Sequence, residues 1–189
     1  YDQNVELKWI LNEKYQSNSE QNFIDFWIIN VWGGISGFKS NERNINKISR
    51  FKKQIEKGRL SLDCFSTISS LSKISSFLNP EKFVIYDSRV IYTLNWLILT
   101  CENENGLYKK YYPIPSGRNR KISAFDMNTI INISHISENI KKEELFVSQQ
   151  QAYFNFCDFI KKATKEIYGI KAKPYELEML LFTLADREI

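Results

Sequence analysis

The stretch from Ser88 to about Cys101 constrains the fold most, because it is apolar on nearly every side that a helix would present. Its apolar positions include Val90, Ile91, Leu94, Trp96, Leu97 and Ile98. A helix of this kind is stable only where other elements cover it. The sequence therefore predicts a central, buried helix with other helices packed around it.

Apolar residues recur at helical spacing along most of the remaining chain. The predicted helices are Val5–Tyr15, Phe23–Trp32, Glu42–Lys57, Leu60–Leu78, Glu143–Tyr168, one that opens at a capping box at Ser123–Asp126, and one that begins at Pro174. Extended structure is expected only at Phe83–Tyr86 and Tyr111–Tyr112. The length of 189 residues suits one domain. We therefore predict an all-α, compact single-domain bundle of about seven to eight helices over residues 1–189.

Several classes of protein are disfavoured by the composition. No apolar run approaches the ~20 residues of a membrane span, and no signal segment opens the chain. The three cysteines show no metal-ligand spacing and are expected to be buried thiols in a reducing cytoplasm. The single histidine, His135, is expected at the surface. We expect no metal and no cofactor. Because the sequence opens on Tyr1 rather than Met, we expect that it is trimmed at its N-terminus.

The net charge of +4 is small, but the basic residues gather in two segments, Arg50–Arg59 and Lys109–Lys121. The second segment combines cations with Tyr111, Tyr112 and turn residues, as a loop that contacts phosphates and stacks on bases would. The candidate DNA contacts are Arg89, Lys109, Lys110, Arg118, Arg120 and Lys121. A solvated charged loop, and for Arg89 an ion pair with a nearby acid, are the alternatives. DNA is the expected partner, with a nucleoid-associated location.

One run of sequence carries a motif. Ser72–Phe77 is followed by Asn79-Pro80, then by an apolar approach that ends at Asp87, and Asp87 opens the buried helix. This arrangement resembles the catalytic segment of the helix-hairpin-helix DNA glycosylase superfamily, and most of all the bacterial proteins with the 8-oxoguanine DNA glycosylase fold. Weaker similarity extends to Trp32–Ile35 and Tyr175–Phe182.

The resemblance implies a role for two residues. Asp87 matches the carboxylate at the start of the buried helix, and Lys73 matches the lysine that bifunctional members use to form a Schiff base. The alternatives from local sequence are that Asp87 is only a helix N-cap and that Lys73 is only a solvated helix lysine. The glycine-containing hairpin of the superfamily has no counterpart in Cys64–Ser72.

A base extruded from DNA needs a pocket with a flat apolar wall and a few polar groups. Trp27, Trp32 and Phe182 are candidates for the wall, and Glu178 is a candidate for reading the edge of the base. Core packing of the aromatic residues and a solvated glutamate are the alternatives.

The leading hypothesis is a DNA N-glycosylase, a hydrolase that excises a damaged or modified base in DNA repair and that has lyase activity if Lys73 is its nucleophile. Oxidised guanine is the substrate that the resemblance implies, and a modified base of phage DNA stays open beside it. The alternative is a non-catalytic helical module that binds nucleic acid or a protein. A metal-dependent nuclease is disfavoured because the sequence lacks clustered acids and histidines.

Overall fold

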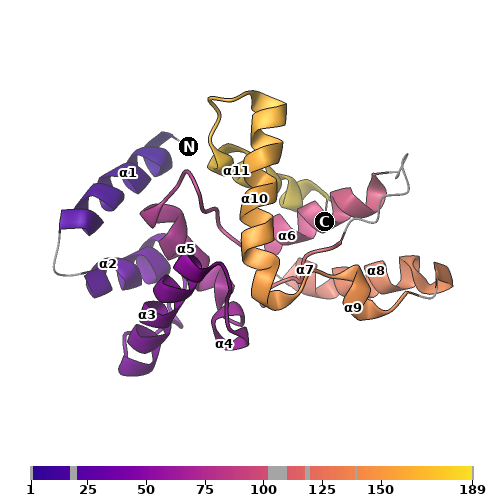
Figure 1. The fold of residues 1–189 in the computed structure, drawn as a ribbon, viewed down its shortest axis with the longest axis horizontal. Coiled ribbons are helices and arrows are strands. Elements are labelled where there is room, and N and C mark those ends of the chain that lie inside the picture. Colours follow the sequence, from indigo (N-terminus) through magenta and orange to yellow (C-terminus); the bar gives the residue numbers. More distant parts are fainter. Residues whose placement is uncertain (1, 18–20, 102–109, 118–119, 139, 189) are drawn as a thin grey trace.

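The computed structural model describes residues 2–17, 21–101, 110–117, 120–138 and 140–188 (Figure 1). Within these residues the regular structure is helical, and the only strand-like pairing is an isolated bridge between Tyr111 and Phe146. The all-α prediction is confirmed.

The helices follow the chain in this order: α1 Asp2–Ser17, α2 Gln21–Trp27, the π-helix η1 Ile28–Trp32, α3 Glu42–Lys57, α4 Leu62–Phe65, α5 Ile68–Leu78, α6 Ser88–Thr100, α7 Arg120–Ala124, α8 Met127–Ser134, the 3-10 helix η2 Ile136–Glu138, α9 Lys142–Leu145, α10 Gln149–Tyr168 and α11 Pro174–Glu188. None of the helices in the described ranges is long and apolar enough to cross a membrane.

The predicted helix Leu60–Leu78 is divided into α4 and α5, which corrects the sequence prediction. Ser66 Oγ donates to the carbonyl of Asp63 at 2.8 Å, and Thr67 Oγ1 donates to the carbonyl of Cys64 at 3.4 Å. Such side-chain hydrogen bonds compete with the helical backbone pattern. The chain therefore turns at Ser66–Thr67 before α5 begins.

The predicted helix Glu143–Tyr168 is also divided, into α9 and α10. Tyr111 donates its N–H to the carbonyl of Leu145 at 2.8 Å and accepts from the N–H of Val147 at 2.9 Å. This pairing holds residues 145–147 extended, so the helix starts again only at Gln149.

The capping box expected at Ser123 is not the start of a helix, because Ser123 lies inside α7. Asp126 is the N-cap of the next helix, α8, and its carboxylate accepts from the N–H of Thr129 at 3.2 Å. Asp is a favoured cap wherever a helix leaves its first N–H groups unpaired.

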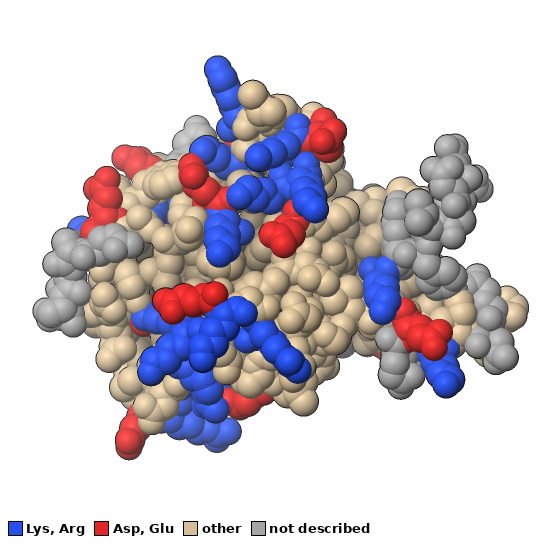
Figure 2. Space-filling view, in the orientation of Figure 1, with Lys and Arg blue, Asp and Glu red and all other residues tan. Residues whose placement is uncertain are grey.

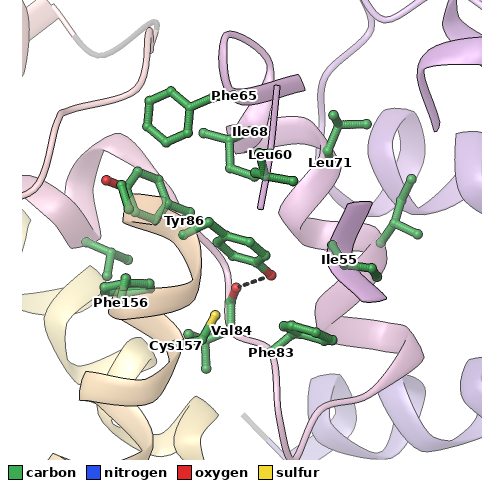
Figure 3. Packing of buried hydrophobic residues seen from close by; sticks show 14 of the residues in the cluster. Ile55, Leu60, Phe65, Ile68, Leu71, Phe83, Val84, Tyr86, Phe156 and Cys157 are labelled. Atoms are coloured by element: carbon green, nitrogen blue, oxygen red, sulfur yellow. Dashed lines mark hydrogen bonds between the residues drawn. The ribbon is translucent and has the colours of Figure 1, made fainter. Parts of the chain in front are cut away.

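Two groups of helices make up the molecule, α1–α5 on one side and α6–α11 on the other (Figure 1). The largest apolar cluster draws on both groups, with Ile55 from α3, Leu71 from α5 and Phe156 from α10 (Figure 3). Residues 83–86 run extended and buried through this cluster. Tyr153 donates to the carbonyl of Val84 at 3.1 Å, the dashed line in Figure 3. The core therefore fixes the segment that leads to Asp87.

The expectation of a central helix holds for the first half of α6, which is buried from Val90 to Asn95. The second half is less covered than expected, and Leu97 is 38% exposed. Two other expectations are corrected. Cys101 is exposed, although Cys64 and Cys157 are buried. His135 is half-buried rather than at the surface, and its ring nitrogen lies 2.8 Å from the hydroxyl of Tyr111.

Candidate functional site

A pocket of about 830 Å³ is lined by both groups of helices. Its walls come from α1, the turn after η1, α5, residues 85–89, residues 116–117 and α11. Pockets that bind small molecules and cofactors have volumes of this order. Of the residues that the sequence singled out, Trp32, Lys73, Asp87, Arg89, Glu178 and Phe182 line this pocket.

Lys73 lies on α5 and is only 7% exposed, so it is not a solvated helix lysine. Its Nζ donates to the carbonyl of Ser69 at 2.7 Å. Burial lowers the pKa of Lys73 below its usual range, and the nearby carboxylates of Asp87 and Glu178 partly offset this. A buried amine of this kind is deprotonated more often than a surface lysine and is a better nucleophile.

The close approach of the turn after η1 fixes the stem of Lys73. A Cβ on Gly33 would lie 2.7 Å from Lys73 Cδ and 2.7 Å from the carbonyl oxygen of Ile29. Only glycine fits between these atoms without displacing them. The next residue, Gly34, has a φ of +63°, a conformation that glycine adopts readily.

Asp87 is the N-cap of α6 and also lines the pocket. One of its carboxylate oxygens accepts from the N–H of Arg89 at 2.9 Å. The capping role expected as an alternative is therefore present. Capping does not exclude a role for Asp87 in the pocket, because a carboxylate that accepts one capping hydrogen bond can still accept others.

Hydrogen bonds to two other segments, and one close backbone approach, hold α6 and the residue before it in place. The N–H of Tyr86 donates to Ser72 Oγ at 3.0 Å, which ties the extended segment to α5. Asn95 exchanges two hydrogen bonds with the backbone of Tyr112, at 2.8 and 2.9 Å. A Cβ on Gly117 would lie 2.4 Å from Ser88 Oγ, so glycine lets this loop lie directly on the start of α6.

Glu178, on α11, is 4% exposed and is not a solvated glutamate. Its carboxylate accepts from the N–H of Ile85 at 3.4 Å. Burial raises the pKa of Glu178, and the positive charge of Lys8 partly offsets this. The segment 85–87 therefore joins the two carboxylates of the pocket, because Ile85 at one end contacts Glu178 and Asp87 is the other end.

Lys8 is a pocket residue that sequence reasoning missed. It lies on α1, is 6% exposed, and has its Nζ 5.5 Å from the ring centre of Phe77 and 5.8 Å from that of Tyr175. Burial lowers the pKa of Lys8, and Glu178 opposes this shift. The signal in the sequence is that Lys8 stands in the same helical stripe as Val5 and Tyr15.

The aromatic candidates separate into two sets. Trp32 packs edge-on against Phe77, with ring centres 4.8 Å apart, and Phe182 is 40% exposed with the guanidinium of Arg89 4.9 Å from its ring centre. Both line the pocket. Trp27 does not line the pocket, although it packs against the same apolar cluster as Trp32, which includes Ile24 and Phe77.

The candidate DNA contacts are spread over the surface. Arg89 is at the pocket, Lys110 is exposed beside a second hollow, and Arg120 and Lys121 are exposed on α7. Lys109 and Arg118 lie outside the described residues.

In the segment Arg50–Arg59, two cations pair with acids. Lys52 lies 2.5 Å from the buried carboxylate of Asp25, and Arg50 lies 3.2 Å from Asp63. Basic side chains also gather over the C-terminal part of α10, a group that the sequence prediction did not include (Figure 2). Its exposed lysines are Lys161, Lys162 and Lys165.

No family model, no curated protein and no solved structure matches this chain. In the described part of the chain, no group of three or more His, Cys, Asp or Glu side chains is placed to hold a metal ion. The chemistry that the pocket offers is that of a buried amine, a carboxylate at a helix start, and aromatic walls.

Proposed function

We propose that the protein is a DNA N-glycosylase that flips a damaged or modified base into the pocket and excises it. Asp87 is the key carboxylate and Lys73 the nucleophile. The observation that carries the proposal is that a buried lysine and a helix-start aspartate, paired by their sequence motif, line one pocket with aromatic walls.

Base excision through a covalent intermediate uses groups of these two types. When an N-glycosidic bond breaks, positive charge develops on the sugar, and the carboxylate of Asp87 stabilises it. The neutral amine of Lys73 attacks the C1′ carbon, and the electron pair of the broken bond leaves with the base, which takes up a proton. The sugar ring then opens as its oxygen takes a proton, and the nitrogen and C1′ are left joined as a Schiff base.

The pocket has groups suited to a flat heterocycle and to the phosphates that flank it. Trp32 and Phe182 supply aromatic surface, and Arg89 places a cation beside Phe182. A flipped base is held by such stacking, while cations contact the DNA backbone.

The test uses Asp87→Asn and Lys73→Gln on duplexes that carry oxidised, alkylated or hypermodified bases. Asn caps a helix about as well as Asp, so Asp87→Asn keeps the fold while excision falls sharply. Lys73→Gln abolishes the covalent enzyme–DNA adduct that borohydride traps, and with it strand nicking.

Two matched variants serve as controls. Asp126→Asn makes the same change at the N-cap of α8, and Lys47→Gln makes it at a buried lysine that pairs with Asp63 at 2.9 Å outside the pocket. Both should keep full activity. Full excision by Asp87→Asn would show that the assigned chemistry is wrong.

A non-catalytic module is the second candidate. The glycosylase superfamily has a glycine-containing hairpin before the lysine, and the turn at Ser66–Thr67 that precedes Lys73 contains no glycine. Such a module binds DNA without turnover. If the parent protein binds duplex DNA but excises nothing from the panel, this candidate replaces the glycosylase.

A further inference from the structure

The side chain of Lys8 is largely buried, and its ammonium group lines the pocket without a polar partner in the described part of the chain. Lys8 is 6% exposed and lines the pocket, and its Nζ has no hydrogen-bond or ion-pair partner among the residues that the structure describes. Two aromatic rings lie near its Nζ, those of Phe77 and Tyr175. A largely buried ammonium has room for few water molecules, so a ligand acceptor that takes up its remaining donors would be bound more strongly than one at an exposed lysine.

Lys8 differs in this respect from the other buried lysine of the pocket. The Nζ of Lys73 already donates to the carbonyl of Ser69 at 2.7 Å. Glu178 lies close enough to Lys8 for each to shift the pKa of the other toward its charged form, yet the two form no salt bridge within 4.0 Å. Glu178 therefore favours the charged form of Lys8 without occupying its donors.

The aromatic surroundings limit what can reach this ammonium. A ligand that lies against Trp32 or Phe182 presents only its edge to the polar groups of the pocket. An exocyclic oxygen on that edge is an acceptor that suits the ammonium of Lys8. An exocyclic amino group in the same place is itself a hydrogen-bond donor, so it could not accept from the ammonium of Lys8 and would leave it unpaired.

We propose that Lys8 is a specificity-determining residue, whose ammonium donates a hydrogen bond to an exocyclic oxygen of a flat heterocycle bound in this pocket. The inference rests on the proposed function for the source of the heterocycle, which is a base flipped from DNA. It assigns the selection of that base to α1, an element outside the motif that contains Lys73 and Asp87.

The test measures binding of free bases, which needs no bond cleavage. Hypoxanthine is compared with adenine, and uracil with cytosine, by NMR titration of the isotope-labelled protein. In each pair the oxo base should bind the parent about 10- to 100-fold more tightly, the range that one hydrogen bond to a charged group provides. Lys8→Met keeps the length of the stem and should abolish this preference.

Lys14→Met makes the same change at an exposed lysine of α1 and should leave the preference intact. Thermal unfolding of each variant verifies that it is folded. Equal binding of oxo and amino bases by the parent, an unchanged preference in Lys8→Met, or no binding of any of the four bases would overturn the proposal.

The outcomes also separate this inference from the proposed function. A parent that prefers oxo bases in the titration but excises nothing from DNA contradicts the glycosylase alone. Excision whose base preference is unchanged by Lys8→Met contradicts the role of Lys8 alone.

Discussion

Replacing Gly33 by alanine should disturb the pocket at one defined point. The backbone there is right-handed helical, with φ −79° and ψ −7°, so alanine meets no conformational strain. Its Cβ would lie 2.7 Å from the carbonyl oxygen of Ile29, and 2.7 and 2.9 Å from Cδ and Cε of Lys73. Carbon atoms pack best at about 3.5–4.0 Å, so the stem of Lys73 has to move.

The size of the effect follows from this overlap. Overpacking of a buried site costs about 1–3 kcal/mol. For a domain of this size each kcal/mol lowers the melting temperature by about 2–4 °C, so Gly33→Ala should melt about 2–12 °C below the parent. A nucleophile displaced by ~1 Å loses about 100-fold in rate, so borohydride trapping should fall by that factor in the folded variant.

Gly37→Ala is the matched control, because a Cβ at Gly37 meets nothing within 4 Å and its φ is not positive. It should leave stability unchanged or raise it by about 0.4–1 kcal/mol, with full trapping. Thermal unfolding followed by circular dichroism and adduct yield at a temperature well below melting give the two readouts. Equal melting temperatures for the two variants would refute the packing argument. A destabilised Gly33→Ala protein that traps DNA normally would refute the predicted displacement of Lys73 and assign the cost to the contact with the Ile29 carbonyl.

Three further predictions concern charge. Burial raises the pKa of Asp25 to about 6 from the 3.8 of an unperturbed aspartate, so the parent should lose about 3 kcal/mol of stability as pH rises from 3 to 7. Urea unfolding of Asp25→Asn should show no such loss. In the proposed mechanism the neutral amine of Lys73 is the nucleophile, so trapping in the parent should increase with pH toward a midpoint below 10.5. A midpoint at or above that value would contradict the burial argument. Lys110→Glu combined with Arg120→Glu should weaken duplex binding for all sequences and reduce the slope of log affinity against log salt by about 1.8, and an unchanged slope would exclude these residues as phosphate contacts.

It could be predicted from the sequence that Lys73 and Asp87 line one pocket, because the short segment between them determines their placement. Pro80 follows the end of α5, and the apolar residues 83–86 can only run back through the core. The hydrogen bond from the N–H of Tyr86 to Ser72 shows that this return brings the start of α6 beside α5. Pro80 and the apolar run 83–86 are therefore the sequence features that predict the closeness of α5 and the start of α6.

The rest of the pocket depends on contacts between distant parts of the chain. Lys8 and Glu178 each look like an ordinary helix residue in the sequence, and only the packing of α1 and α11 around the pocket buries them. The break before α10 has the same kind of cause, since it follows from pairing with Tyr111. Periodicity indicates which face of a helix is covered, as the stripe of Lys8 shows, but not which element covers it, so the sequence predicted neither the burial of these two side chains nor the break.

The charges of the pocket make one last variant informative, because Glu178 favours the charged form of both Lys8 and Lys73. In Glu178→Gln the pKa of each lysine should fall further, since burial then acts with less opposition. The neutral fraction of Lys73 increases, so the midpoint of the trapping profile moves to lower pH. Lys8 is an ammonium less often, so the preference for oxo bases weakens. In this one variant, trapping at a given pH should therefore increase while the preference for oxo bases decreases. An unfolded or distorted pocket would instead lose both trapping and base preference. A trapping midpoint that stays where it is in the parent would contradict the electrostatic argument.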